Sequence, residues 1–147
     1  ALKKHELKLA TAESCTGGGA AQLVTSVAGS SEWFDRGFVT YTNVSKREML
    51  GVKTTTLSRF GAVSEQTARE MADGAIAHSH AQAALAITGI AGPGGGTPEK
   101  PVGTVCFAWA GKKRATKSVK HHFTGDREAV RRQSIVVALQ GLLEFLR

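Results

Sequence analysis

The sequence lacks long apolar segments and has few of the residues that build metal sites or disulfide frameworks. Only two of its 147 residues are cysteines, Cys15 and Cys106. Two widely separated thiols form neither a zinc site nor a disulfide framework, so we expect free thiols in a reducing cytoplasm. No stretch approaches the roughly 20 apolar residues of a membrane-spanning helix, and no signal peptide is visible. These absences argue against a membrane protein, a disulfide-stabilised secreted domain and a metal-activated water.

Positive charge is the feature that the composition does offer. The formal net charge is +7, which suits an anionic ligand such as a nucleic acid or a nucleotide phosphate. Basic residues are densest in one expected hairpin, at Lys112, Lys113, Arg114, Lys117 and Lys120. Few aromatic residues lie among them, so we interpret this cluster as a solvated turn and edge strand, where lysines discourage edge pairing. A nucleic-acid partner is therefore the less favoured interpretation.

The order of apolar patterns predicts one α/β domain, residues 1–147, of a size that buries a proper core. Strands are expected at residues 7–12, 38–41, 83–88, 102–110 and 115–123. Helices are expected at residues 20–27, 44–50, 54–60, 65–78 and from 126 onward, with caps at Asn43, Ser64 and Asp126 and a stop at Gly51. This order packs as a three-layer α/β/α sandwich with a mixed, mostly parallel sheet.

Glycine-rich loops follow two of the expected strands. Residues 13–19, ESCTGGG, lie between a strand and a helix, an arrangement that directs free backbone N–H groups at an anion. Glycine there is equally explained by close helix–sheet packing, and the spacing alone leaves both interpretations open. The second loop, residues 92–101, follows the strand at 83–88, and in open α/β sheets ligands bind outside such strand ends.

Residues 29–51 combine two serines, a short strand ending in Tyr41, and Lys46. A serine that attacks a carbonyl must lose its proton, and a lysine accepts that proton only if its pKa is lowered towards the working pH. Lys46 is expected in the first turn of a helix, whose electropositive end, with a cationic substrate, would lower this pKa. The spacing predicts that Ser30 or Ser31 meets Lys46, although a plain Gly-Ser-Ser turn and a solvated lysine fit the same residues.

Four motifs carry a resemblance to a known family: TAESCTGG at 11–18, GSSEWFDRGFVTYTN at 29–43, GAVSEQTAREMA at 61–72 and AITGIAGPGGGTPEKPVGTV at 86–105. Together they closely resemble the CinA C-terminal domain family, in particular its stand-alone, PncC-like members. The resemblance runs from about Leu9 to the C-terminus. It implies a CinA-like sandwich and a cytoplasmic bacterial enzyme of NAD metabolism. That enzyme would hydrolyse nicotinamide mononucleotide (NMN) to nicotinate mononucleotide and ammonia.

By this resemblance, the family's functional residues fall on Ser14, Ser31, Tyr41, Lys46, Thr88 and Arg127. We hypothesise that Ser31 attacks the carboxamide and that Lys46 takes its proton, with Ser30 as the rival nucleophile. Tyr41 would orient Lys46 or lie against the pyridinium ring. The expected binding residues are Ser14, Thr16, Gly17, Ser30, Thr88, Gly89 and Arg127. Among them, the 14–18 loop and Arg127 would bind phosphate, and Thr88 would bind ribose or carboxamide.

The sequence leaves other functions open. The chain could serve as a non-catalytic, nucleotide-binding CinA-like module, or bind nucleic acid. Cys15, beside Ser14, is a less favoured nucleophile because no histidine lies near it in the sequence. No cofactor and no metal are expected. We expect a homo-oligomer, since small domains with exposed strand edges often pair.

Overall fold

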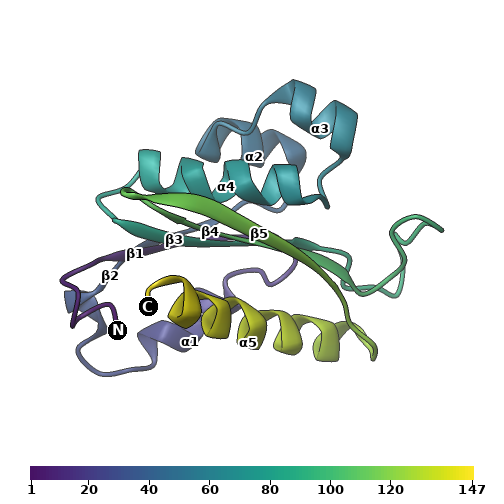
Figure 1. Ribbon diagram of the computed structural model, residues 1–147. Helices are drawn as coiled ribbons and strands as arrows, with labels where there is room; N and C mark the ends of the chain where they lie inside the picture. Colours follow the sequence, from purple (N-terminus) through teal and green to yellow (C-terminus); the bar gives the residue numbers. More distant parts are fainter.

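Five strands form one mixed sheet that carries helices on both faces (Figure 1). The computed structural model describes all 147 residues. The sheet order is β2-β1-β3-β4-β5, with bounds β1 (Leu9–Glu13), β2 (Phe34–Val39), β3 (Ala83–Gly89), β4 (Thr104–Gly111) and β5 (Arg114–His122). Strand β1 pairs in parallel with β2 and β3, whereas β4 is antiparallel to β3 and β5. All strands except β4 therefore run in one direction, and the predicted mixed sandwich is confirmed.

The helices divide into two layers (Figure 1). One face of the sheet carries α2 (Asn43–Leu50), α3 (Thr54–Phe60) and α4 (Glu65–Ala77), and the other carries α1 (Gly19–Thr25) and α5 (Arg127–Phe145). A single 3-10 turn, η1 (Ser30–Glu32), precedes β2. No helix is both long enough and apolar enough to span a membrane.

Most predicted caps are confirmed. The side chains of Ser64 and Asp126 accept the N–H groups of Thr67 and Ala129, at 3.1 and 2.9 Å. The cap predicted at Asn43 is wrong by one residue. The Thr42 hydroxyl accepts the N–H of Ser45, and the Ser45 hydroxyl accepts the N–H of Thr42, so that a reciprocal capping box begins α2 at residue 43.

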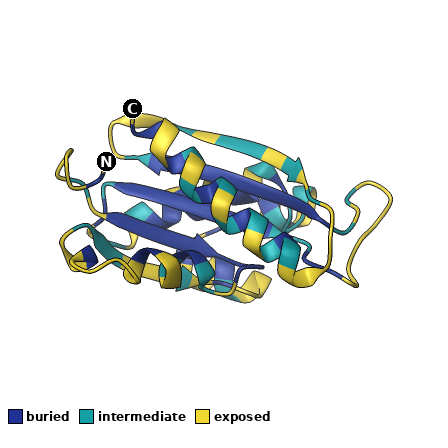
Figure 2. Ribbon diagram, turned by 90° about the horizontal axis from the view of Figure 1, so that it is seen from below, coloured by how far each residue is buried: buried dark blue, intermediate teal, exposed yellow.

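The two faces of the sheet carry side chains of different size. Successive strand residues point to opposite faces, and in β1, β3 and β4 large and small residues alternate. The face towards α1 and α5 presents Leu9, Leu85, Ile87, Phe107 and Trp109. The face towards α4 presents alanines, at positions 10, 12, 84, 86, 108 and 110. The alanine face lets α4 lie close to the sheet. Figure 2 shows the central strands buried beneath α5, whose outer surface is exposed.

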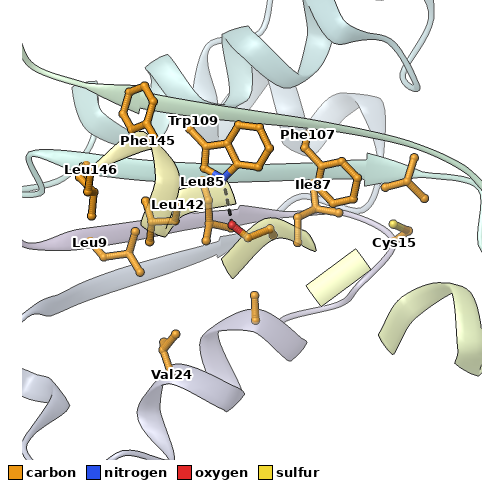
Figure 3. Packing of buried hydrophobic residues seen from close by; sticks show 14 of the residues in the cluster. Leu9, Cys15, Val24, Leu85, Ile87, Phe107, Trp109, Leu142, Phe145 and Leu146 are labelled. Carbon is orange, nitrogen blue, oxygen red and sulfur yellow. Dashed lines mark hydrogen bonds between the residues drawn. The ribbon is translucent and has the colours of Figure 1, made fainter. Parts of the chain in front are cut away.

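Trp109 fixes α5 against the sheet (Figure 3). Its indole N–H donates to the Ala138 carbonyl oxygen at 2.9 Å. Its ring stacks on Phe107 with 6.2 Å between centroids. An added Cβ at Gly141 would overlap the indole, so glycine is required where the ring crosses α5. The contact sets the position of α5 along the sheet, and with it the position of Arg127 in the helix's first turn.

Strand β2 begins earlier than the sequence predicts, and this difference determines which serine can lie near Lys46. Instead of 38–41, the strand spans Phe34–Val39, with Phe34 opposite Leu9 and Val39 opposite Glu13. Its first and last residues are five steps apart, and at about 3.3 Å per step the two ends of β2 are separated by about 17 Å. The serine pair therefore precedes the start of β2, whereas Tyr41 follows its end.

Candidate active site at the carboxyl ends of the strands

A cavity of about 260 Å³ opens at the sheet edge where β1, β2 and β3 end. Ser14 follows β1, Tyr41 follows β2, and Thr88 lies near the end of β3. The helices α2 and α5 add Lys46 and Arg127. This is the edge at which open α/β sheets bind ligands. A larger hollow of about 600 Å³ between β5 and α5 contains no lysine–serine pair of this kind.

Lys46 and Ser14 form a buried pair in this cavity. The Nζ atom of Lys46 lies 3.0 Å from Ser14 Oγ and donates to the Thr40 carbonyl oxygen at 2.8 Å. Lys46 is only 1% exposed and takes part in no ion pair. Burial lowers its pKa from 10.5 to about 8, because a low-dielectric environment disfavours the charged amine. With this pKa, about a tenth of the lysine is an uncharged base at pH 7 and about half at pH 8, far more than at the ordinary pKa.

The local sequence accounts for the position of Lys46. The capping box at Thr42, three residues after β2 ends, starts α2 at Asn43 and places Lys46 one turn into the helix. Helical side chains tilt towards the N-terminus, so the amine reaches back to the carbonyl of Thr40. At the other end of α2, Leu50 packs against Gly74 of α4, where an added Cβ would overlap the Leu50 carbonyl. The base is thus carried by a helix fixed at both ends.

Ser30 and Ser31 lie at the opposite edge of the sheet. Both belong to η1, Ser30 buried and Ser31 exposed, and neither lines the cavity. The Ser30 carbonyl accepts the N–H of Trp33 at 3.0 Å, which closes the turn before β2. The predicted pairing of Lys46 with Ser31, or with its rival Ser30, is therefore not formed, because the length of β2 separates them. The serine that meets Lys46 is Ser14.

Glu13 is a buried carboxylate that sequence reasoning overlooked. It is 1% exposed, and it accepts the hydroxyl of Thr16 at 2.6 Å and the N–H groups of Ala20 and Ala21 at 2.8 and 3.1 Å. An internal anion thus already occupies the electropositive start of α1. The only signal in the sequence was an acidic residue at the end of an apolar strand, directly before a glycine-rich turn.

The 14–18 loop is held from two sides, by Glu13 and by Arg131. Thr16 is bound by Glu13, and neither Thr16 nor Gly17 lines the cavity. Arg131 of α5 donates to the carbonyl oxygens of Cys15 and Thr16, at 3.1 and 3.3 Å. Thr16 and Gly17 therefore lie outside the cavity that holds Ser14 and Lys46, and their predicted contact with substrate phosphate stays a prediction. In the structure they hold the loop that presents Ser14.

Arg127 connects two walls of the cavity. Its guanidinium donates to the Gly92 carbonyl oxygen and to the Tyr41 hydroxyl, both at 2.7 Å. Tyr41 is 57% exposed and makes no hydrogen bond to Lys46. The Thr40 carbonyl, and not Tyr41, therefore orients the lysine. Tyr41 still lines the cavity, so its predicted contact with a pyridinium ring stays a prediction.

Thr88 and Gly89 form the cavity wall at the end of β3. The Thr88 hydroxyl donates to the Ala62 carbonyl oxygen at 2.8 Å and keeps acceptor capacity for a ligand. At Gly89 an added Cβ would lie 2.9 Å from the Thr104 carbonyl oxygen, too close for any other residue without movement of β4. Both residues line the cavity, as predicted for binding residues.

Cys15 lines the cavity as a neutral thiol. Burial raises its pKa to about 11, so the nucleophilic thiolate is scarce at neutral pH. This removes Cys15 as a rival to Ser14. No group of three or more His, Cys, Asp or Glu side chains is arranged to hold a metal ion.

Comparisons with known proteins agree with this architecture. The family model of the CinA C-terminal domain matches residues 1–146. "Nicotinamide-nucleotide amidohydrolase PncC" of Enterobacter agglomerans is 53% identical over 148 residues, which cover 100% of this chain and 90% of that protein. A "CinA-like protein" of Akkermansia muciniphila is 50% identical and matches 99% of this chain, but only 35% of its own length. The crystal structure of competence/damage inducible protein CihA from Agrobacterium tumefaciens superposes with a TM-score of 0.96 at 48% identity, over 98% of this chain and 88% of that one. The chain belongs to the CinA C-terminal domain family.

Proposed function

We propose that this chain is an amidohydrolase that converts nicotinamide mononucleotide to nicotinate mononucleotide and ammonia, with Ser14 as nucleophile and Lys46 as base. The observation that carries the proposal is the 3.0 Å contact between Ser14 Oγ and the buried amine of Lys46, whose pKa burial lowers to about 8. We take the substrate from the similar protein of Enterobacter agglomerans, which is named a nicotinamide-nucleotide amidohydrolase. The catalytic serine differs from Ser31, the residue that the sequence favoured.

Acylation follows from the geometry of the pair. Lys46 removes the Ser14 proton while Oγ attacks the carboxamide carbon, and the carbonyl electrons move onto oxygen. The resulting intermediate collapses with cleavage of the C–N bond, and protonated Lys46 gives its proton to the departing nitrogen. Ammonia leaves, and an ester joins the nicotinoyl group to Ser14. Lys46 is again neutral.

Deacylation uses the same base in the same place. Lys46 takes a proton from a water that attacks the ester carbon, and it returns the proton to Ser14 Oγ as the C–O bond breaks. The products are a carboxylate and the free serine. The Thr40 carbonyl accepts a hydrogen bond from the amine in each protonation state. It therefore holds Nζ beside Oγ through both halves of the reaction.

The developing oxyanion needs a donor beside Ser14. The N–H of Cys15 donates to no backbone carbonyl, and Cys15 lines the cavity directly after the nucleophile. We assign this N–H to the oxyanion, where a donor contributes roughly 3–4 kcal/mol in well-studied enzymes. The hydrogen bonds from Arg131 to the carbonyls of Cys15 and Thr16 would keep it in place.

The pyridinium charge of the substrate supports the lysine base. A cation bound near Lys46 disfavours the ammonium form, so substrate binding would keep the amine neutral. The exposed ring of Tyr41 at the cavity mouth would lie against the pyridinium, where a cation–π contact contributes about 0.5–2 kcal/mol.

Two serine variants test the proposal. Ser14→Ala should lower kcat for ammonia release from NMN by roughly a thousandfold or more, because the nucleophile is lost. Ser31→Ala, the matched control at the far edge of the sheet, should stay within about twofold of the wild type. Substantial turnover by Ser14→Ala with loss of activity in Ser31→Ala would reverse the assignment.

A second candidate is a nucleotide-binding module without turnover. It is favoured by the relative in Akkermansia muciniphila, in which the matching region is about a third of a longer protein. Binding of NMN by this chain without ammonia release would support it. A cytoplasmic location and a homo-oligomeric state stay predictions, as does the expectation that nucleic acid is not a partner. A gel-shift titration over salt concentration tests the last.

A further inference from the structure

The segment 91–96, AGPGGG, forms a wall of the cavity with unused backbone donors. Three of its glycines, Gly92, Gly94 and Gly95, line the cavity. Apart from Pro93, which has no N–H, none of its residues donates a backbone hydrogen bond to a protein carbonyl. Ala91 and Gly92 are buried, and an unpaired N–H at a buried residue is uncommon in native proteins. The donors at this wall therefore point to a ligand.

The backbone conformation of the loop suits an anion. Gly92 and Gly95 have φ angles of +88° and +92°, a region that glycine adopts freely. Turns that alternate between right- and left-handed conformations gather successive N–H groups into a concavity that binds anions. The hydrogen bond from Arg127 to the Gly92 carbonyl turns that carbonyl towards the arginine and fixes the start of the loop.

The charged residues of the cavity also favour an anionic ligand. The fourteen residues that line it include the cations Lys46 and Arg127 but no Asp or Glu. The other glycine-rich turn of the site cannot take an external anion at the start of α1, because the Glu13 carboxylate already accepts the N–H groups there. Of the segments that line the cavity, the 91–96 loop holds the largest set of amides that donate to no protein carbonyl.

We infer that the 91–96 loop, together with the Arg127 guanidinium, is a binding subsite for a phosphate monoester. On the proposed function, this ligand is the 5′-phosphate of NMN, held opposite the Ser14–Lys46 pair that receives the carboxamide. The identity of the substrate rests on that proposal, whereas the anion subsite rests on the amides and charges of the loop. Arg127 then has two tasks, since it fixes the loop through Gly92 and contributes charge to the phosphate.

Gly94 allows a matched test. An added Cβ there meets no atom within 4 Å, and its φ lies outside the left-handed region, so side chains fit. Gly94→Asp and Gly94→Asn have nearly the same shape and differ by one charge. We would titrate each variant and the wild type with ribose 5-phosphate by calorimetry, with ribose as the uncharged reference. KM and kcat for NMN would be measured on the same preparations.

The subsite predicts that Gly94→Asp binds ribose 5-phosphate at least about tenfold more weakly than Gly94→Asn, because a carboxylate would face the phosphate. The KM for NMN should rise by a similar factor between the two variants, with kcat within about threefold. Equal binding by both variants, or no binding of ribose 5-phosphate by the wild type at millimolar concentration, would overturn the inference. If the wild type binds ribose 5-phosphate with the expected charge dependence but releases no ammonia from NMN, the subsite stands and the proposed function fails.

Discussion

Replacement of the buried Lys46 by methionine measures what the burial of its charge costs in folding stability, independently of its role in catalysis. Lys46→Met keeps most of the side-chain volume and removes the amine. It leaves Ser14 Oγ and the Thr40 carbonyl without the partner they have in the wild type. This loss costs about 1–3 kcal/mol and does not depend on pH. The informative quantity is therefore how the stability difference between variant and wild type changes with pH.

The magnitude follows from the pKa of Lys46, which burial lowers from 10.5 to about 8. At about 1.4 kcal/mol per pH unit, this lowering corresponds to about 3 kcal/mol. In the unfolded chain Lys46 keeps its proton up to about pH 10.5, whereas in the folded chain it loses the proton near pH 8. Between these values the unfolded state binds more protons, so the wild type gains stability as the pH rises. Below about pH 8 the full cost of the buried charge is present.

Urea unfolding of both proteins at several pH values between about 7 and 10 measures this effect. The stability of the wild type relative to Lys46→Met should rise by about 2–3 kcal/mol over that range. Lys112→Met, which removes a charge from an exposed turn, reports the effect of losing a lysine charge alone. A constant difference between wild type and Lys46→Met at every pH would show that the amine is not neutralised by burial, and the base mechanism would lose its physical ground.

Two further predictions follow from the site. The kcat/KM for NMN should rise with pH and level off above about 8, since only the neutral amine of Lys46 accepts the Ser14 proton; a profile that is flat or falls between about pH 7 and 9 would contradict this. Glu13→Gln should destabilise the fold by about 1–3 kcal/mol and lower kcat, because it removes the carboxylate that accepts Thr16, Ala20 and Ala21. Urea unfolding measures the change in stability, and ammonia release measures the change in kcat. Glu99→Gln, on an exposed loop, is the control. An unchanged kcat in Glu13→Gln would show that Glu13 does not position the loop that carries Ser14.

Local signals were sufficient to predict most of the fold. Ser64, Asp126 and Gly51 mark helix ends through hydrogen bonds and dihedral angles within a few residues, and all three are confirmed. The apolar run 83–88 predicts a central strand, and β3 occupies the middle of the sheet. Where the cap moved from Asn43 to Thr42, the deciding contact was the reciprocal bond with Ser45, which the residue types alone do not show.

The site was harder because it depends on contacts between distant segments. The sequence identified Ser14, Tyr41, Lys46, Thr88 and Arg127, and all of them line one cavity. Which serine meets the lysine depends on where β2 starts, and the run FDRGFV has no clean alternation that marks its first residue. The parallel topology indicates which serine lies next to Lys46, because residues that follow parallel strands meet at the same edge of the sheet. That rule favours Ser14 over a serine that precedes a strand.

The state of Cys15 also shapes how the catalytic centre withstands oxidants. A thiol beside a reacting hydroxyl is an obvious target for peroxide or alkylating agents, yet these reagents attack the thiolate. With a pKa of about 11 and 4% exposure, this sulfur behaves as an apolar packing atom between the sheet and its helices. The cavity consequently holds a single activated nucleophile, and no reductant should be required to keep it working.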